Sequence, residues 1–139
     1  MFHRFAAAAT VASVFIGLGA IFVTLCPIGN PSGIDVALRL WCAAPLAWGL
    51  WAMLAPSSWV PQRLPAWGAI LGVIAGIFAA LVLNMPYRVL GVELPALVRG
   101  LAVLIAMGVY YFLWMLVRSA MRAINSRSGG VQESSLPGK

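Results

Sequence analysis

The sequence predicts an all-α membrane protein, one bundle of four antiparallel transmembrane helices with both termini in the cytoplasm. Three observations predict this fold. Of the 139 residues, 63% are hydrophobic and 9% are charged, whereas about a quarter of the residues in a soluble domain are charged. Long apolar segments alternate with short links that are rich in proline, glycine or polar residues. The basic residues lie near the ends of the apolar segments, as membrane orientation requires.

The predicted spans are residues 5–26, 36–55, 66–83 and 96–117. Each is close to the length of about 20 residues that crosses a bilayer core of about 30 Å. The first span is too long for the core of a secretory signal, which runs for about 7 to 15 residues. We therefore expect a single membrane domain, 1–139, in which 118–139 form a basic, partly disordered cytoplasmic tail.

Two of the predicted helices carry small residues at every fourth position, and such residues share one helix face. They are Gly68, Gly72, Gly76 and Ala80 in the third helix and Ala9, Ser13 and Gly17 in the first. In lipid, close approach of two backbones along such faces favours association. We expect the first and third helices to pack through these two stripes. The alternative is that small residues are simply common in membrane helices.

The second predicted helix combines a central proline with three tryptophans. Pro45 has no N–H to donate to the carbonyl of Trp41, so the sequence predicts a kink there. Trp41 and Trp48 share a face, and Trp51 lies about 60° away. These rings either pack against lipid and neighbouring helices or form a flat wall for a quinone, a pigment or a sterol-like ligand.

The basic residues predict the orientation of the bundle. With the N-terminus in the cytoplasm, that side has a net charge of +5 and the opposite side +1, and the positive-inside rule favours this arrangement. The cytoplasmic charges are Arg4, Arg63, Arg118, Arg122, Arg127 and Lys139 against Glu133; the others are Arg39, Arg88 and Arg99 against Asp35 and Glu93. We expect a multi-pass protein of the bacterial inner membrane.

Some charged residues are candidates for binding. Asp35 and Arg39 are one helical turn apart and are expected to form an ion pair. Alternatively, Arg39 and Arg99 converge on an anionic headgroup or on an acidic residue of a partner. Arg118 and Arg122 are expected to meet anionic lipid at the cytoplasmic surface.

Cys26 and Cys42 both fall near the predicted periplasmic face, where an oxidising compartment permits a disulfide. A disulfide needs Cα atoms about 5.5 Å apart, and Cys42 is somewhat deep for that. Two free thiols are the expected arrangement, with a disulfide as the alternative.

The sequence lacks the residues that several classes of function require. No Asp, Glu, Lys or His lies in the middle of a predicted span, which argues against ion-coupled transport. No catalytic constellation, metal-binding cluster or cofactor site is visible, so we predict neither an enzyme nor a cofactor. Dispersed basic residues also argue against nucleic acid as a partner.

The leading hypothesis is a non-catalytic accessory or assembly subunit of a larger respiratory, photosynthetic or secretion complex. Its partners would be membrane lipids and either other membrane subunits or further copies of itself. The first alternative is a small oligomeric channel or transporter of a lipid or solute, with a path lined by Arg39, Arg99 and Asn84. The second is a membrane immunity or holin-like protein.

Overall fold

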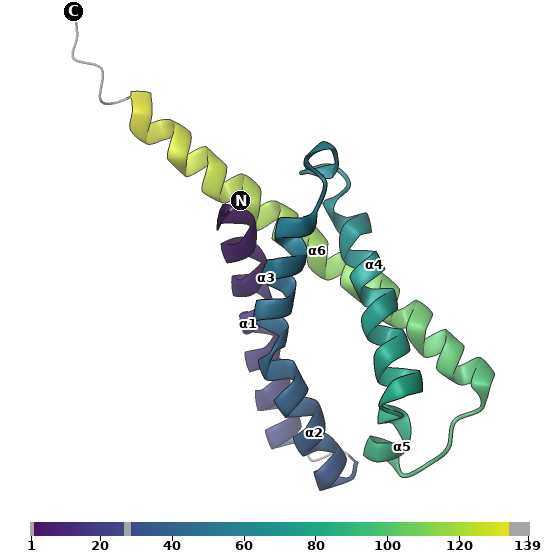
Figure 1. Cartoon of the computed structure of the whole chain (residues 1–139). Coiled ribbons are helices and arrows are strands. Elements are labelled where there is room, and N and C mark those ends of the chain that lie inside the picture. Colours follow the sequence, from purple (N-terminus) through teal and green to yellow (C-terminus); the bar gives the residue numbers. More distant parts are fainter. Residues whose placement is uncertain (1, 27–28, 134–139) are drawn as a thin grey trace, which may run out of the picture.

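The computed structural model describes residues 2–26 and 29–133. Within these residues all the regular elements are helices. In chain order they are α1 (Phe2–Leu25), α2 (Pro31–Cys42), α3 (Ala44–Leu54), the 3-10 turn η1 (Ser57–Trp59), α4 (Leu64–Ile77), the π-helical turn η2 (Phe78–Val82), α5 (Met85–Leu90) and α6 (Ala96–Glu133) (Figure 1).

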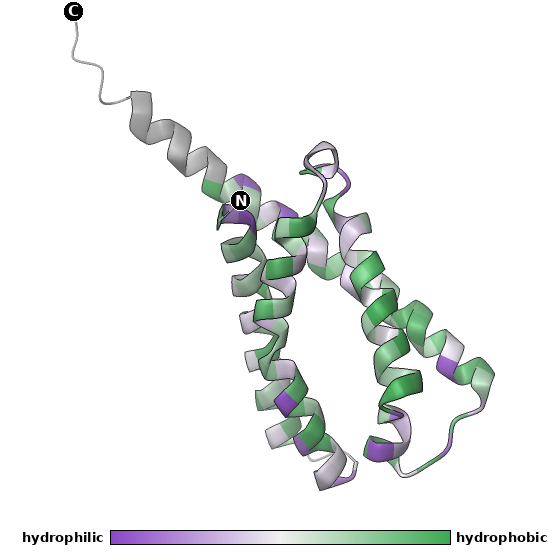
Figure 2. Cartoon of the chain, in the orientation of Figure 1, coloured by the Kyte–Doolittle hydropathy of each residue, from purple (hydrophilic) through white to green (hydrophobic). Residues whose placement is uncertain are grey.

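The lengths and compositions of the helices suit a membrane. Phe2–Leu25, Leu64–Val82 and Ala96–Ile124 are each long and apolar enough to cross one. The pair α2 and α3 forms a fourth candidate span, bent by 41°. Hydrophobic residues cover most of these helices, whereas hydrophilic residues lie mainly toward their ends and in the links (Figure 2). The protein is therefore all-helical within the described residues and has three or four candidate spans.

The predicted kink in the second span is confirmed. The chain leaves the helix at Ala43, and Pro45 lies in the first turn of α3, where its missing N–H costs no helical hydrogen bond. The span begins at Pro31, earlier than the predicted residue 36. The Asn30 side chain accepts a hydrogen bond of 3.2 Å from the Ser32 N–H and so caps this earlier start.

The helices form two hairpins. Helix α1 packs mainly on α3, while α4 packs on α6. Small buried residues of α1, Ala8 and Ala12, belong to a core cluster that also contains Trp48 and Trp114. The two hairpins therefore share a core in which large rings fill the space left by small side chains.

The stripe on α4 meets α6, not the predicted stripe on α1. A Cβ at Gly68 would overlap the Trp114 side chain, and one at Gly72 would lie 2.7 Å from Tyr110 Cβ. Aromatic rings of α6 thus occupy the space that the glycines leave. On α1, Ser13 and Gly17 are exposed and Ala9 is half-buried, because the helix turns Ala8 and Ala12 toward the core instead.

The hairpins are joined at both ends. At one end, the Trp51 indole donates to the Trp67 carbonyl at 3.0 Å and the Trp67 indole donates to the Trp51 carbonyl at 2.9 Å. At the other end, the Asn30 N–H donates to the Val89 carbonyl at 2.7 Å. A side chain at Gly33 would meet the Arg88 backbone, so glycine permits the close contact of α2 with α5.

Helix α6 continues without a break to Glu133, beyond the predicted end at Val117. Its 38 residues span about 57 Å at 1.5 Å each, more than a bilayer core of about 30 Å. The part of the predicted tail up to Glu133 is therefore helical, and 134–139 lie outside the described residues. Arg118 Nη1 donates to the Gln62 carbonyl at 3.3 Å, which ties this part of α6 to the link before α4.

Candidate functional site

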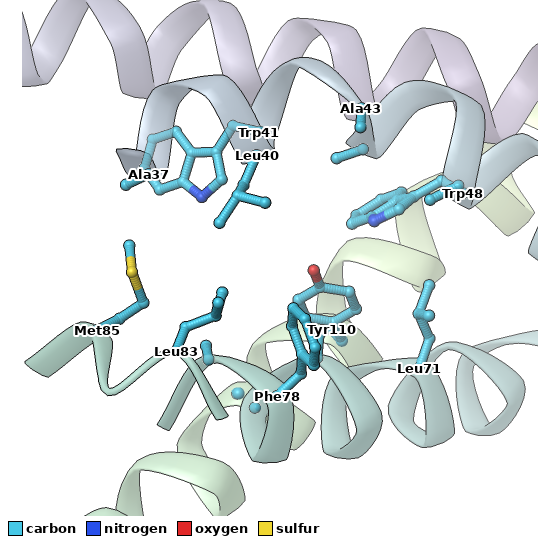
Figure 3. A pocket seen from close by; sticks show the side chains of 16 residues that line it. Ala37, Leu40, Trp41, Ala43, Trp48, Leu71, Phe78, Leu83, Met85 and Tyr110 are labelled. Atoms are coloured by element: carbon cyan, nitrogen blue, oxygen red, sulfur yellow. The ribbon is translucent and has the colours of Figure 1, made fainter. Parts of the chain in front are cut away.

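A cavity of about 420 Å³ lies between the two hairpins. One wall comes from α2 and α3, and the other comes from α4, η2, the start of α5 and α6 (Figure 3). The junctions described above close the bundle on either side of it. The cavity is therefore preformed by the fold, as small-molecule sites usually are.

Small residues make the cavity. Ala44 and Ala47 of α3 line one wall, and Gly76 and Ala79 line the other. The kink at Ala43 turns α2 away from the direction of α3. These features keep the walls apart in the middle of the bundle, while the tryptophan pair at one end and the backbone contact of α2 with α5 at the other hold the hairpins together.

The wall formed by α4 ends in an irregular turn. In η2 the Leu83 N–H donates to the Phe78 carbonyl, five residues earlier, at 2.9 Å. Asn84 follows with a φ of 46°, and this left-handed conformation directs the chain into α5. Phe78, Ala79 and Leu83 all line the cavity. Single π-helical turns of this kind often occur at functional sites.

Three aromatic residues divide this cavity from a second one. Trp41, Trp48 and Tyr110 also line a cavity of about 330 Å³ on the side of α1. The Trp48 and Tyr110 ring centroids are 5.2 Å apart with the planes tilted by 54°. Gly19 of α1 provides room for the Trp41 ring, which a Cβ there would approach to 3.0 Å. Trp48 and Tyr110 are therefore held by packing, whereas Trp41 contacts Gly19 and is partly exposed.

The aromatic residues also place polar groups in the apolar cavity. The Tyr110 hydroxyl points across it toward α2 and α3 (Figure 3), on the side where the Trp48 ring lies, with the two ring centroids 5.2 Å apart. A phenol hydroxyl can both donate and accept a hydrogen bond, whereas an indole N–H can only donate. Within the described residues, no hydrogen bond inside the chain uses the Tyr110 O–H or the Trp41 N–H as donor.

The predicted tryptophan wall forms only in part. Trp41 and Trp48 line the same cavity. Trp51 instead stacks on Trp67 at a centroid distance of 4.8 Å and helps to hold α3 against α4. Tyr110 is the site residue that the sequence did not single out, because nothing local in α6 marks which of its aromatic residues faces α3.

The predicted charged groups lie away from this cavity. Asp35 and Arg39 form the expected ion pair at 2.9 Å, and both side chains are largely exposed. Arg99 Nε donates to the Leu94 carbonyl at 2.8 Å, and no ion pair or hydrogen bond joins it to Arg39 among the described residues. At the opposite end Arg4 donates to the Ala55 carbonyl at 3.2 Å. Arg39 and Arg99 thus have local partners and do not converge on one site.

Cys26 and Cys42 are both free and exposed, so the alternative disulfide is not formed. Across the described residues, His, Cys, Asp and Glu form no cluster of three or more that would suit a metal ion. The cavity can therefore bind a ligand through aromatic faces and a few hydrogen-bond donors.

No protein family model, curated protein or solved structure matches this chain.

Proposed function

We propose that this protein is a non-catalytic subunit of a larger membrane complex, which holds an apolar partner between its two hairpins and contacts other subunits through its outer faces. The observation that carries the proposal is the apolar cavity of about 420 Å³ between the hairpins, which is partly open to its surroundings and which the side chains of this protein do not fill. Unfilled apolar space forfeits packing energy. A partner that occupies it would recover that energy.

The outer face of α1 supports a second contact, with a helix of another protein. Ser13 and Gly17 are exposed on this face, and a Cβ at Gly17 would meet nothing within 4 Å. Close helix packing in lipid uses small residues of this kind. Because α4 uses its own small residues on α6, those of α1 stay available to a partner.

The transporter alternative receives less support. It requires Arg39, Arg99 and Asn84 to line one path. Arg39 forms an ion pair with Asp35, and Arg99 donates a hydrogen bond to the Leu94 carbonyl. Asn84 is the N-cap residue of α5. The cavity lining contains none of the three.

Native-gel electrophoresis of gently solubilised membranes, followed by mass spectrometry of the band, tests the proposal. We expect a large band with defined companion proteins. Gly17→Leu should release the companions, while Val14→Leu, at a position that is 55% exposed on the same helix, should retain them. A band that holds only this chain would refute the role as a subunit.

We also propose four spans with both termini in the cytoplasm of a bacterial inner membrane. The charge difference between the two sides supports this topology. A reporter that is active only in the periplasm should stay inactive when fused to Lys139 and become active when fused after Gly91. Activity at Lys139 would overturn the proposed topology.

A further inference from the structure

We propose that the cavity between the hairpins binds a flat, apolar molecule that carries a carbonyl group, the chemistry of a quinone. The inference rests on the proposed role of this cavity as the binding site, and it names the class of occupant. Three features of the cavity carry it: its volume, its aromatic lining and its unused hydrogen-bond donors.

The volume of the cavity, about 420 Å³, favours a small molecule as its occupant. The same volume lies within the range of about 300–1,000 Å³ that is typical of small-molecule sites.

The aromatic lining favours a flat occupant. The rings of Trp41, Trp48, Phe78 and Tyr110 come from both hairpins and surround one space (Figure 3). Aromatic rings gain energy from stacked or edge-on contact beyond the burial of their area. Since the junctions at both ends hold the hairpins, the occupant would meet these rings with little rearrangement.

The polar groups in the lining favour a hydrogen-bond acceptor on that occupant. The Tyr110 O–H points into the cavity, and the Trp41 indole nitrogen also faces it (Figure 3). Among the described residues, no Asp, Glu, Lys, Arg or His lines it. A carbonyl oxygen satisfies such donors without bringing a charge or a further donor into an apolar site. A bare hydrocarbon chain would leave them unpaired.

The proposal is tested by titrating the purified protein in detergent with decylubiquinone. Quenching of the tryptophan fluorescence of the protein measures binding. We expect saturable quenching by wild type. Tyr110→Phe should weaken binding by about 2- to 12-fold, the loss of one net hydrogen bond. Ala47→Phe, which fills the cavity, should abolish saturable binding. Leu46→Phe, at a neighbouring side chain that is 58% exposed, is the matched control and should bind as wild type does.

Circular dichroism of each variant first establishes that it is folded. Absence of saturable quenching by folded wild type, or unchanged affinity in Tyr110→Phe, would overturn the proposal. Equal competition by decylbenzene, which has the same tail and no carbonyl, would also overturn it and indicate a site for hydrocarbon chains. If the protein binds the quinone but co-purifies with no companion proteins, the proposed quinone site stands and only the role as a subunit is refuted.

Discussion

The contact of the α4 glycines with α6 gives the sharpest test of the packing, through Gly68→Ala and its matched control Gly17→Ala. The new Cβ at Gly68 would overlap Cβ, Cγ and Cδ1 of Trp114, a residue with no exposed surface. These atoms are next to the backbone and cannot move aside as a flexible chain end does. Overpacking of this kind costs about 1–3 kcal/mol.

The control removes the contribution of helix propensity. Replacing glycine by alanine in a helix gains about 1 kcal/mol at either position, and a Cβ at Gly17 meets nothing within 4 Å. The two variants should therefore differ by about 1–3 kcal/mol, or about 5- to 140-fold in the folded-to-unfolded ratio. Reversible unfolding in mixed micelles, with a rising mole fraction of dodecyl sulfate, measures this difference. Greater loss in Gly17→Ala would refute the observed pairing and favour packing of α1 on α4.

Three further substitutions test other contacts in the same unfolding assay. Trp67→Phe removes the hydrogen bond to the Trp51 carbonyl and should cost at least about 0.5–1.5 kcal/mol, the net contribution of one hydrogen bond; wild-type stability would refute this. Asp35→Asn removes an exposed ion pair and should change stability by less than about 1 kcal/mol; a larger loss would contradict a purely local role. Gly33→Ala should destabilise the junction of α2 with α5, because its Cβ would meet backbone atoms; wild-type stability would show that this junction does not hold the hairpins.

The features that the sequence predicted correctly are local ones. The all-helical architecture, with three or four helices long and apolar enough to cross a membrane, follows from the length of each apolar run, and the kink follows from the missing N–H of Pro45. The ion pair between Asp35 and Arg39 follows from their spacing of one helical turn. Each of these depends on residues that are close in the chain, so one segment contains all the information needed.

The pairing of the helices depends on residues far apart in the chain. A glycine stripe indicates that some helix approaches closely, but not which one. The choice was decided by Trp114 and Tyr110 of α6, whose rings fit over Gly68 and Gly72, and no periodicity in α6 marks them. In the same way, Trp51 does not line the cavity with Trp41 and Trp48, because it stacks on Trp67 of the next helix.

Native mass spectrometry of the protein released from its own membranes tests the central claim, that the cavity between the hairpins holds an apolar partner. The wild-type chain should carry a small apolar molecule that Leu46→Phe also carries and that the cavity-filling Ala47→Phe lacks. A bare wild-type chain, or the same bound molecules on Ala47→Phe as on wild type, would contradict it.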